Sequence, residues 1–585
     1  MSKKKLREDA ETRFALMAND RAKYEPWWKE LGKQFAQSRG RFHGEERAKQ
    51  SPKRRNSRPY QIADAHAAGM QSGLMSPTRQ WFTLNVFDRD LETIERVRAY
   101  LNEVQEIMQG RLLQSNFYDQ AFDFLKEEGV YGTAAMFIEE DDEDVFVCKT
   151  LTAGQYSIGT DDRGRVNRFA RSLSYTVLQL VEDFGYEHLP REIQAIVDRN
   201  ESNNARFEVR HLIQPNTRYE SPDPGPPGMA YQSLWWLPGY SDPLFVRESG
   251  YHEFPVIVAR WRIIGNDIYG REQPADVALD DAQTLQDLET DARGALEREV
   301  KPPMLAPSSL AGKLDNRPNK VSLYEPIPTQ GGVPAVTPLF NVKFSHEAAE
   351  TKIAMLVQAI ESAFFVDLFR MWSSDLRIGR TATEIQARDA ERAYILGPVT
   401  LRQTNEFATK VLIRLFGILQ RAPSEPENPM LPVPPPELAE KRVKIEYISE
   451  FALLQKQAAR GGIEAVLAMA AQLAELQAAT GGTPDVLDKI DPDEILDQVA
   501  DMYAIPAGMV LGDDATERLR EDRALAFKQQ QEAAMAQEQM ARAAQSAPDI
   551  ARAAKDLSEA KMGGRGGNNA LEFLTNALDE GGGTM

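Results

Sequence analysis

Cysteine is nearly absent from this chain of 585 residues, which contains only Cys148. A single cysteine excludes an internal disulfide and a cysteine-based zinc site, so we expect the chain to fold in a reducing compartment. Long hydrophobic runs are missing too: the best candidate, residues 353–369, contains Glu361 and Asp367 and falls short of the ~20 apolar residues of a membrane span. The basic N-terminus has no apolar segment, so we expect an intracellular product without a secretory signal.

Motifs for catalysis and cofactor binding are also missing. The chain has no Gly-rich phosphate loop, no HExxH zinc helix and no GxSxG nucleophile elbow. The string nearest to a phosphate loop, residues 154–160, lacks the lysine that would reach the phosphates. The six histidines have no ligand spacing, and the acids at 491–494 suit a helix cap. The adjacent pair His252 and Glu253 has no partner, so we expect a satisfied or exposed side chain. We therefore expect no enzyme, no cofactor and no metal.

Charge is plentiful and mostly negative, with 88 acidic against 69 basic residues and a net charge of −19. This balance argues against a protein whose whole surface grips nucleic acid, because such binding depends on Lys and Arg at the phosphates. Residues 1–60 nevertheless carry +9 and the rest −28. A basic cluster at residues 53–58 is typical of a solvated loop, although a phosphate contact or an acidic neighbouring subunit would also suit it.

Hydrophobic periodicity predicts a mixture of helices and strands before residue 276. Helices are expected at residues 8–37, where Pro26 interrupts the pattern, and at 62–74, 91–128 and 177–184. Six consecutive acids at 139–144 are typical of a solvated hairpin tip and lack the spacing of a calcium loop. Strands are expected at 81–87, on both sides of that tip, and at 155–158, 166–175, 207–214, 232–237 and 255–261.

The character of the chain changes at residue 276. Residues 276–300 have a helical pattern with eight acids and two bases, which gives −6 on a helix about 37 Å long. Its narrow apolar stripe predicts one packed side and one acidic side in water. A Pro/Gly/Asn-punctuated insert with short β-rich pieces separates it from a more apolar helix at 346–369. We expect the two helices to form an antiparallel pair along an apolar seam.

A loop with three arginines, residues 370–380, follows the second helix. Thr381 or Thr383 can cap the next helix, with Glu384 in its first turn. Pro398 should break or kink that helix, which continues to residue 419.

The C-terminal part of the chain is mostly helical. A proline-rich strap leads into one β run at 443–449, and helical patterns dominate from residue 450. Residues 515–562 have a long Ala/Gln/Glu pattern with few large apolar residues. Such a helix is marginal alone, so we expect it to assemble between copies of the chain.

Seven strings of the sequence are notable: SGLMSPTRQWFTL (72–84), EEGVYGTAAMFIEED (127–141), FPVIVARW (254–261), YGREQPADVALDDAQTLQDLE (269–289), KPPMLAP (301–307), RTATEIQARDAERAYILGPV (380–399) and KIEYISEFALLQKQ (444–457). In this order they resemble the head-to-tail connector or portal proteins of short-tailed bacteriophages. Together they cover about residues 10–460. In the sixth string, the positions that match the family's motif are Thr381, Thr383, Glu384, Gly397 and Pro398.

The resemblance implies an α+β multi-domain portal fold whose copies form a ring, usually of twelve, at one capsid vertex. The parts of the family fold are carried over to this chain in order. They would be an α/β wing (1–275), a first stem helix (276–300), a clip (301–344), a second stem helix (345–369), a channel loop (370–382), wing return helices and strand (383–449), a helical crown (450–514), a helical barrel-like segment (515–562) and a flexible tail (563–585).

The same resemblance implies a channel for genome packaging and ejection, assembled in the host cytoplasm and carried in the virion. The partners would be double-stranded DNA, the terminase large subunit, tail adaptor proteins, the major capsid protein and scaffolding protein, with no membrane. An acidic stem helix would repel phosphates and let DNA slide. Its candidate channel-lining residues are Asp280, Asp287, Asp291 and Glu297. Arg370, Arg377 and Arg380 would either contact phosphates at a constriction or pair with stem acids.

Two other protein classes compete with this interpretation. A terminase-type enzyme, or another non-portal packaging component, would need a nucleotide loop and clustered catalytic acids. A scaffold or coiled-coil adaptor would need sustained heptads, whereas over half of this chain has α/β character. An acidic protein that handles DNA is understandable if it conducts DNA and does not retain it.

Overall fold

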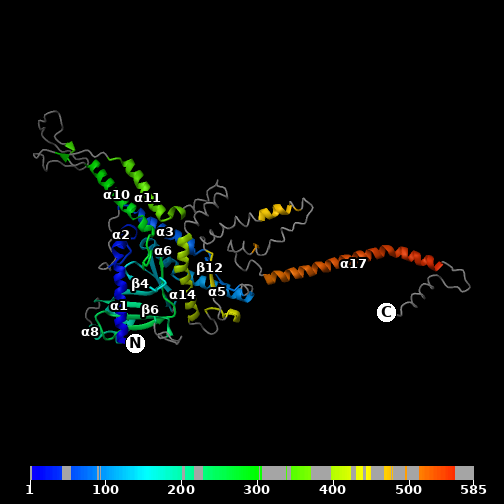
Figure 1. Cartoon of the computed structure of the whole chain (residues 1–585), viewed down its shortest axis with the longest axis horizontal. Helices are drawn as coiled ribbons and strands as arrows, with labels where there is room; N and C mark the ends of the chain where they lie inside the picture. Colours follow the sequence, from blue (N-terminus) through cyan, green and yellow to red (C-terminus); the bar gives the residue numbers. More distant parts are fainter. Residues whose placement is uncertain are drawn as a thin grey trace, which may run out of the picture. The chain divides into compact units, whose positions relative to one another are not determined.

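A computed structural model gives the arrangement of the chain (Figure 1). Contacts divide it into two units, one of Met1–Glu92 with Arg96–Ala504 and one of Thr93–Glu95 with Ile505–Met585. The sheets belong to the first unit, and the long helix α17 (Asp513–Glu559) belongs to the second. The structure describes residues 3–42, 55–88, 91, 94–141, 143–199, 205–216, 228–301, 304–305, 337–338, 344–369, 397–422, 430–438, 443–448, 467–475, 477, 495–496 and 513–559.

The N-terminal helices follow the predicted pattern. Helix α1 (Lys3–Ala22) ends two residues before α2 (Glu25–Phe35), and Pro26 lies in the first turn of α2. Proline is tolerated there because the first-turn N–H groups have no partner within the helix. Helix α3 (Arg58–Met75) covers the predicted segment 62–74. The interruption at Pro26 is therefore confirmed.

The single helix predicted at 91–128 is wrong, because the structure has two helices there. Helix α5 (Glu95–Gln114) ends before Ser115, and α6 (Phe117–Tyr131) begins two residues later. The Ser115 hydroxyl donates to the Leu112 carbonyl (3.1 Å) and accepts from the Phe117 N–H (3.2 Å). This side chain competes with the backbone ladder, which ends one helix and starts the next.

Two antiparallel sheets form the body of the first unit. The three-stranded sheet has the order β3-β2-β9, and the five-stranded sheet has the order β4-β5-β6-β7-β8. The predicted strands are confirmed, as is the helix α7 (Val177–Phe184), whereas α8 (Arg191–Asp198) and β8 were not predicted. The strands are β2 (Thr133–Asp141), β3 (Val145–Leu151), β4 (Tyr156–Thr160), β5 (Val166–Thr176), β6 (Arg206–Pro215), β7 (Tyr231–Trp236), β8 (Arg247–Tyr251) and β9 (Val256–Arg260).

One hydrophobic core joins the sheets to the helix pair that follows. Its buried side chains include Trp28 from α2, Tyr131 from α6, Phe169 from β5, and Leu285 and Ile360 from the pair. The glycine-containing segment 154–160 contributes the buried strand β4 to the same core, so it is structural. The helix pair is thus rooted in the body by apolar packing.

The helix pair consists of α10 (Leu279–Val300), preceded by the short α9 (Pro274–Val277), and α11 (His346–Ala363). Between them the structure describes the two-residue strands β10 (Met304–Leu305) and β11 (Thr337–Pro338), which pair antiparallel. The rest of the predicted clip lies outside the described residues.

The second predicted helix, at 346–369, is too long by one turn. Helix α11 ends at Ala363, and Phe364 and Phe365 form a turn before residues 366–369 become helical again. Phe365 has a φ of 59°, a conformation that costs a bulky residue on the order of 1–3 kcal/mol. The turn is held because the Phe364 ring is buried and its carbonyl accepts a hydrogen bond from His66 Nδ1 (2.8 Å).

The chain then returns to the body. A helix described from residue 397 continues through a π-helical turn (Thr404–Ala408) into α14 (Thr409–Arg421). The segment just before residue 397 lies outside the described residues, so the break or kink at Pro398 stays a prediction. Strand β12 (Val443–Tyr447) pairs antiparallel with β1 (Phe82–Val86). Sequence patterns predicted both strands but not their pairing.

Helix α17 has 47 residues, equivalent to about 70 Å of helix, and confirms the helix predicted near 515–562. Leu519, Leu525 and Phe527 are exposed on it. Its assembly between copies stays a prediction. Most of the predicted crown and the tail lie outside the described residues. In the described part of the chain, every helix is too short or too polar to span a bilayer.

Candidate functional site

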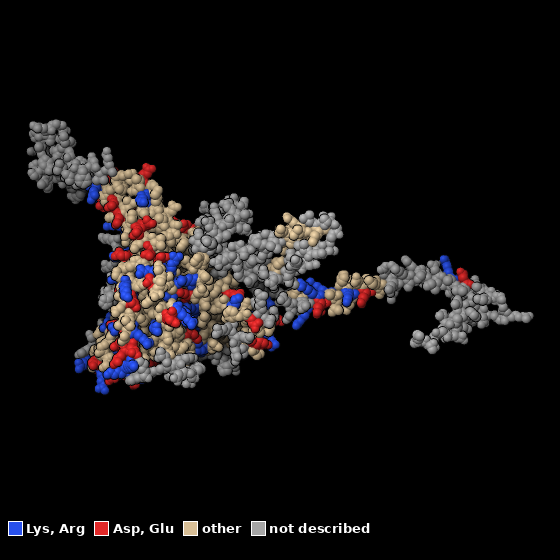
Figure 2. Space-filling view, in the orientation of Figure 1, with Lys and Arg blue, Asp and Glu red and all other residues tan. Residues whose placement is uncertain are grey.

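The helix pair α10–α11 is the most acidic exposed feature that the sequence singled out. The helices run antiparallel, because Glu299 at the end of α10 meets His346 at the start of α11 (Oε2 to Nε2, 2.7 Å). Leu285, Leu356 and Ile360 are buried at the root of the pair. The predicted apolar seam is therefore confirmed. Figure 2 shows carboxylates exposed along the pair.

Three of the four candidate acids share one face of α10. At 100° per residue, Asp280, Asp287 and Asp291 fall within about 40° of one another around the helix, and all are exposed. We call these three residues the acidic stripe. No ion pair joins any of them to another described residue. Glu297 is exposed too, but it lies about 100° away from the stripe. The structure thus groups three of the four predicted residues.

The base of the acidic stripe is fixed to the body. Trp27 Nε1 donates to Asp276 Oδ1 (3.0 Å), one turn before Asp280. Burial raises the pKa of Asp276, and the hydrogen bond from Trp27 opposes this rise. Asp276 therefore anchors the helix, whereas the stripe beyond it faces solvent.

The basic cluster predicted as a solvated loop is bound to α10 where the structure describes it. Gln286 Oε1 accepts from the backbone N–H groups of Arg55 (3.2 Å) and Asn56 (3.0 Å), and Gln286 Nε2 donates to the Asn56 carbonyl (2.8 Å). Asn56 Nδ2 also donates to Glu289 (2.9 Å). Arg55 and Arg58 remain exposed beside the acidic helix. The cluster therefore adjoins an acidic element of its own chain.

The remaining candidate residues divide between two regions. Arg370, Arg377, Arg380, Thr381, Thr383 and Glu384 lie outside the described residues. Gly397 and Pro398 lie in the helix that returns to the body, where the Gly397 carbonyl accepts from Thr400 Oγ1 (2.9 Å).

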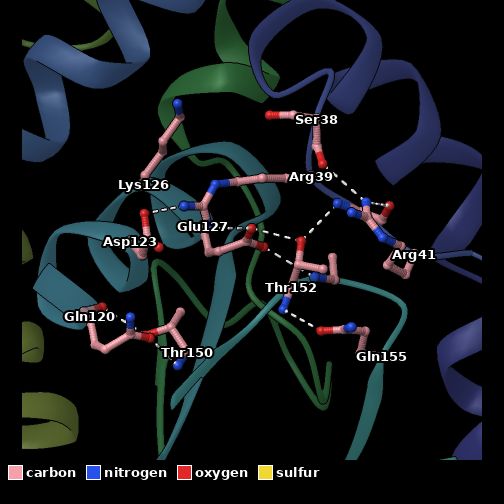
Figure 3. A network of polar contacts seen from close by, with 12 residues as sticks. Ser38, Arg39, Arg41, Gln120, Asp123, Lys126, Glu127, Thr150, Thr152 and Gln155 are labelled. Atoms are coloured by element: carbon pink, nitrogen blue, oxygen red, sulfur yellow. Dashed lines mark hydrogen bonds and ion pairs between the residues drawn. The ribbon is translucent and has the colours of Figure 1, made fainter. Parts of the chain in front are cut away.

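Sequence reasoning missed a buried polar network around Glu127, which is shown in Figure 3. Glu127 of α6 accepts hydrogen bonds from Arg39 Nη1 (3.2 Å), Thr152 Oγ1 (2.7 Å) and the Ala153 N–H (3.1 Å). Arg39 also pairs with Asp123. Burial raises the pKa of Glu127, and these donors oppose the rise. The network fastens the segment after α2 to α6 and β3, so the string EEGVYGTAA is structural here.

A second buried carboxylate lies next to the first. Glu128 accepts a hydrogen bond from Gln403, at the start of the π-helical turn. Burial raises the pKa of Glu128 to about 8, so this carboxyl is mostly protonated at neutral pH. His66 packs against Gly129, and burial lowers its pKa to about 4. Near neutral pH both groups are therefore mostly uncharged. Glu128 lies where α6 contacts the helix that leads into α14, and His66 lies where α3 contacts the turn after α11.

The acidic hairpin tip was predicted to be solvated, but one of its residues, Glu140, pairs with α14. Arg421 Nη2 of α14 donates to Glu140 (3.1 Å), and Arg421 Nη1 donates to Glu253 (2.6 Å). The buried Arg414 also donates to Glu253 (2.7 Å). Burial would raise the pKa of Glu253, but the two arginines lower it. Glu253 is therefore a satisfied side chain, one of the two outcomes expected for it.

A buried Ser–His pair in the five-stranded sheet has its hydrogen bond in the wrong direction for nucleophilic catalysis. Arg171 Nε donates to His211 Nδ1 (3.1 Å), so the proton of the neutral ring is on Nε2, which donates to Ser233 Oγ (2.9 Å). A general base would need a free Nε2 lone pair facing the hydroxyl. Burial, then Arg171, lowers the pKa of His211. This cluster is a packed polar core.

The described residues offer little further chemistry. They contain no group of three or more His, Cys, Asp or Glu side chains that could hold a metal ion. Cys148 is buried, and burial raises the pKa of its thiol to about 12, which keeps the thiol protonated. The acidic stripe is therefore the strongest candidate for function.

Comparison with known proteins gives consistent matches over most of the chain. A family model described as bacteriophage head to tail connecting protein matches residues 7–510. The chain is 30% identical over 527 residues to the portal protein of Salmonella phage epsilon15 and 29% identical over 529 residues to the probable portal protein of Bordetella phage BPP-1. Each match covers 89% of this chain and 91% of the relative.

Similarity to solved structures is more distant. A chain from the neck of an empty gene transfer agent particle is 11% identical and has a TM-score of 0.32. The match covers 73% of this chain and 91% of that one. A TM-score this low adds nothing on the arrangement of domains.

Proposed function

This chain belongs to the bacteriophage head to tail connecting protein family and functions as a portal protein, and from that premise we propose how its parts do so. Copies of the chain, twelve by the family's usual number, form a ring at one capsid vertex. Residues 1–275 form the wing, α10 and α11 form the stem, and 301–344 form the clip that docks tail adaptors. Residues 383–449 return to the wing, 450–514 form the crown, and α17 builds a barrel with its neighbours.

The acidic stripe carries the proposal for DNA passage. Stripes from all copies line the channel and repel the phosphates of double-stranded DNA, which keeps the DNA centred and free of strong ion pairs. A lining rich in Lys and Arg would instead release counterions and retain the DNA. The stripe supports this role because its three carboxylates are exposed on one face and unpaired within the described chain.

The loop at 370–382 supplies the complementary contact. We propose that Arg370, Arg377 and Arg380 touch passing phosphates transiently, while the terminase large subunit drives packaging from outside. Pairing with stem acids of a neighbouring copy is the other role open to them. The major capsid protein and scaffolding protein would contact the wing.

The ring is tested by native mass measurement. Twelve copies of the 65.6 kDa chain amount to about 790 kDa, and a monomer or dimer would overturn the ring.

The stripe is tested with the triple variant Asp280→Asn, Asp287→Asn and Asp291→Asn in assembled phage. We expect slower ejection that recovers as salt is raised, because less repulsion allows DNA to linger on the wall. The matched control removes the same charge from exposed body positions by Asp162→Asn, Glu182→Gln and Glu187→Gln. Equal ejection rates in the two variants would remove the stripe from DNA passage.

A further inference from the structure

A hollow of about 660 Å³ lies on one flank of the helix pair. Its walls come from α10, α11 and the start of α3. Apolar side chains of α11 contribute its floor and charged groups surround them, mostly carboxylates. The lining residues that matter here are Ile353, Ala354 and Val357 for the apolar part, and Glu289, Glu350 and Asp367 for the acidic part. We call this surface the stem groove.

One carboxylate in the stem groove lacks a donor. Asp367 Oδ1 is buried and has no hydrogen-bond partner among the described residues. A buried acceptor left unpaired is costly, and native structures generally supply a donor or water. The groove therefore combines an apolar floor with a mostly acidic rim, which also includes Arg58.

The opposite flank of α11 has the complementary chemistry. Lys352, Met355 and Ala359 are exposed, and at 100° per residue they fall within about 60° around the helix. Met355 is 59% exposed, and no ion pair joins Lys352 to another described residue. The centre of this flank lies roughly 160° from Glu350 and Val357, which line the groove. We call these three residues the stem knob.

We propose that the stem knob of one copy docks into the stem groove of the next copy around the ring. Met355 would cover the apolar floor beside Glu350, and Lys352 would pair with Glu350. Because knob and groove lie on opposite flanks of one helix, each copy contacts two neighbours through a head-to-tail interface that can close into a ring. This inference rests on the ring proposed above and assigns its contact along the stem.

Disulfide trapping tests the register of this contact. The double variant Glu350→Cys with Met355→Cys places one thiol on each flank, and the native Cys148 is buried. Five residues along a helix separate the two Cα atoms by about 8–9 Å, beyond the ~7 Å reach of a disulfide, so any bond joins two chains. On assembled rings we expect a ladder of covalent oligomers after mild oxidation.

The single variants are the matched controls for trapping. Each has a thiol on one flank only, so a head-to-tail interface gives no covalent dimer from either. Intact rings that yield no ladder from the double variant would overturn the proposal. Dimers from Met355→Cys alone would overturn it as well, because they require a two-fold contact.

Charge exchange tests the energetics. Lys352→Glu opposes like charges in the contact, and we expect the subunit concentration for half-assembly to rise about tenfold or more. Adding Glu350→Lys should restore assembly, since every interface then regains opposite charges. Both side chains are exposed, so circular dichroism of the subunit should not change. Unchanged assembly of Lys352→Glu would overturn the proposal, whereas a wild-type chain that never forms rings would overturn the proposed ring itself.

Discussion

Carboxylates serve opposite purposes in the body and in the helix pair. In the body, Glu127 is buried beneath three hydrogen-bond donors, and Glu253 is held by two arginines. On α10, Asp280, Asp287 and Asp291 are exposed and paired with no described residue. The same chemical group therefore fastens elements together in one region and presents a negative field to solvent in the other.

The difference predicts that loss of a carboxylate destabilises the body more than the acidic stripe. Removing a partner from a buried ion pair leaves an uncompensated charge, whereas an exposed charge is already solvated. The body should thus be sensitive to loss of single acids, and the stripe should tolerate it. The variants described next are ways to break or sharpen this contrast.

The largest effect is expected from Glu127→Ala. This change leaves Arg39 without its buried partner and the Ala153 N–H without an acceptor, which should cost about 3–5 kcal/mol of unfolding free energy. Urea unfolding followed by circular dichroism, at fixed subunit concentration, measures it. Asp287→Ala is the control and should stay near wild type. Equal losses in the two variants would erase the contrast between the regions.

A smaller change in the free energy of unfolding is expected as pH rises, because Glu128 then loses its proton. Its pKa in the folded chain is about 8 against an ordinary 4.5, so its stabilisation is complete at low pH and is lost as pH rises toward 8. Between pH 6.5 and 8 this loss should reach roughly 2 kcal/mol. His66 acts in the opposite direction, because its lowered pKa of about 4 makes stability fall as pH drops below 6.5.

Glu128→Gln isolates this contribution. The amide keeps the shape and stays neutral, so the decline of stability between pH 6.5 and 8 should flatten. Melting temperatures in matched buffers across this range measure the slope. A variant with the same slope as wild type would show that another group titrates there.

The smallest effect on stability is expected from the triple Asn variant of the acidic stripe. Each of the three carboxylates is exposed, so the total change should stay within about 0.5–1 kcal/mol. Melting temperature at low and high salt measures it, and relief of repulsion should make any gain larger at low salt. A large loss of stability would mean that these acids have structural partners, contrary to their exposure.

Local pattern was enough to place most elements of the body and the acidic helix. The alternation of Phe82, Leu84 and Val86 gave a strand, and Pro26 gave a break between helices. The stripe follows from spacing alone, since positions 280, 287 and 291 repeat near the helical period. Features that depend on contacts between residues far apart in the sequence were not predicted.

The features that were not predicted have physical causes that hydrophobic periodicity does not register. Ser115 ends α5 through its own hydroxyl, a competition that periodicity ignores. The turn at Phe364 depends on His66, which comes from α3. Local pattern does not mark Glu127 as a core residue, because its partners Arg39 and Thr152 come from other parts of the chain.

The pairing of β1 with β12 gives the first unit a closed topology. The segment between Phe82 and Tyr447 includes both helices of the pair, and its two ends are joined by one antiparallel ladder. Leu285 and Ile360 pack into the same core where the pair leaves and re-enters the body. The two helices can therefore lengthen or shorten together, by matched turns at their far ends, without disturbing the strands that hold the body.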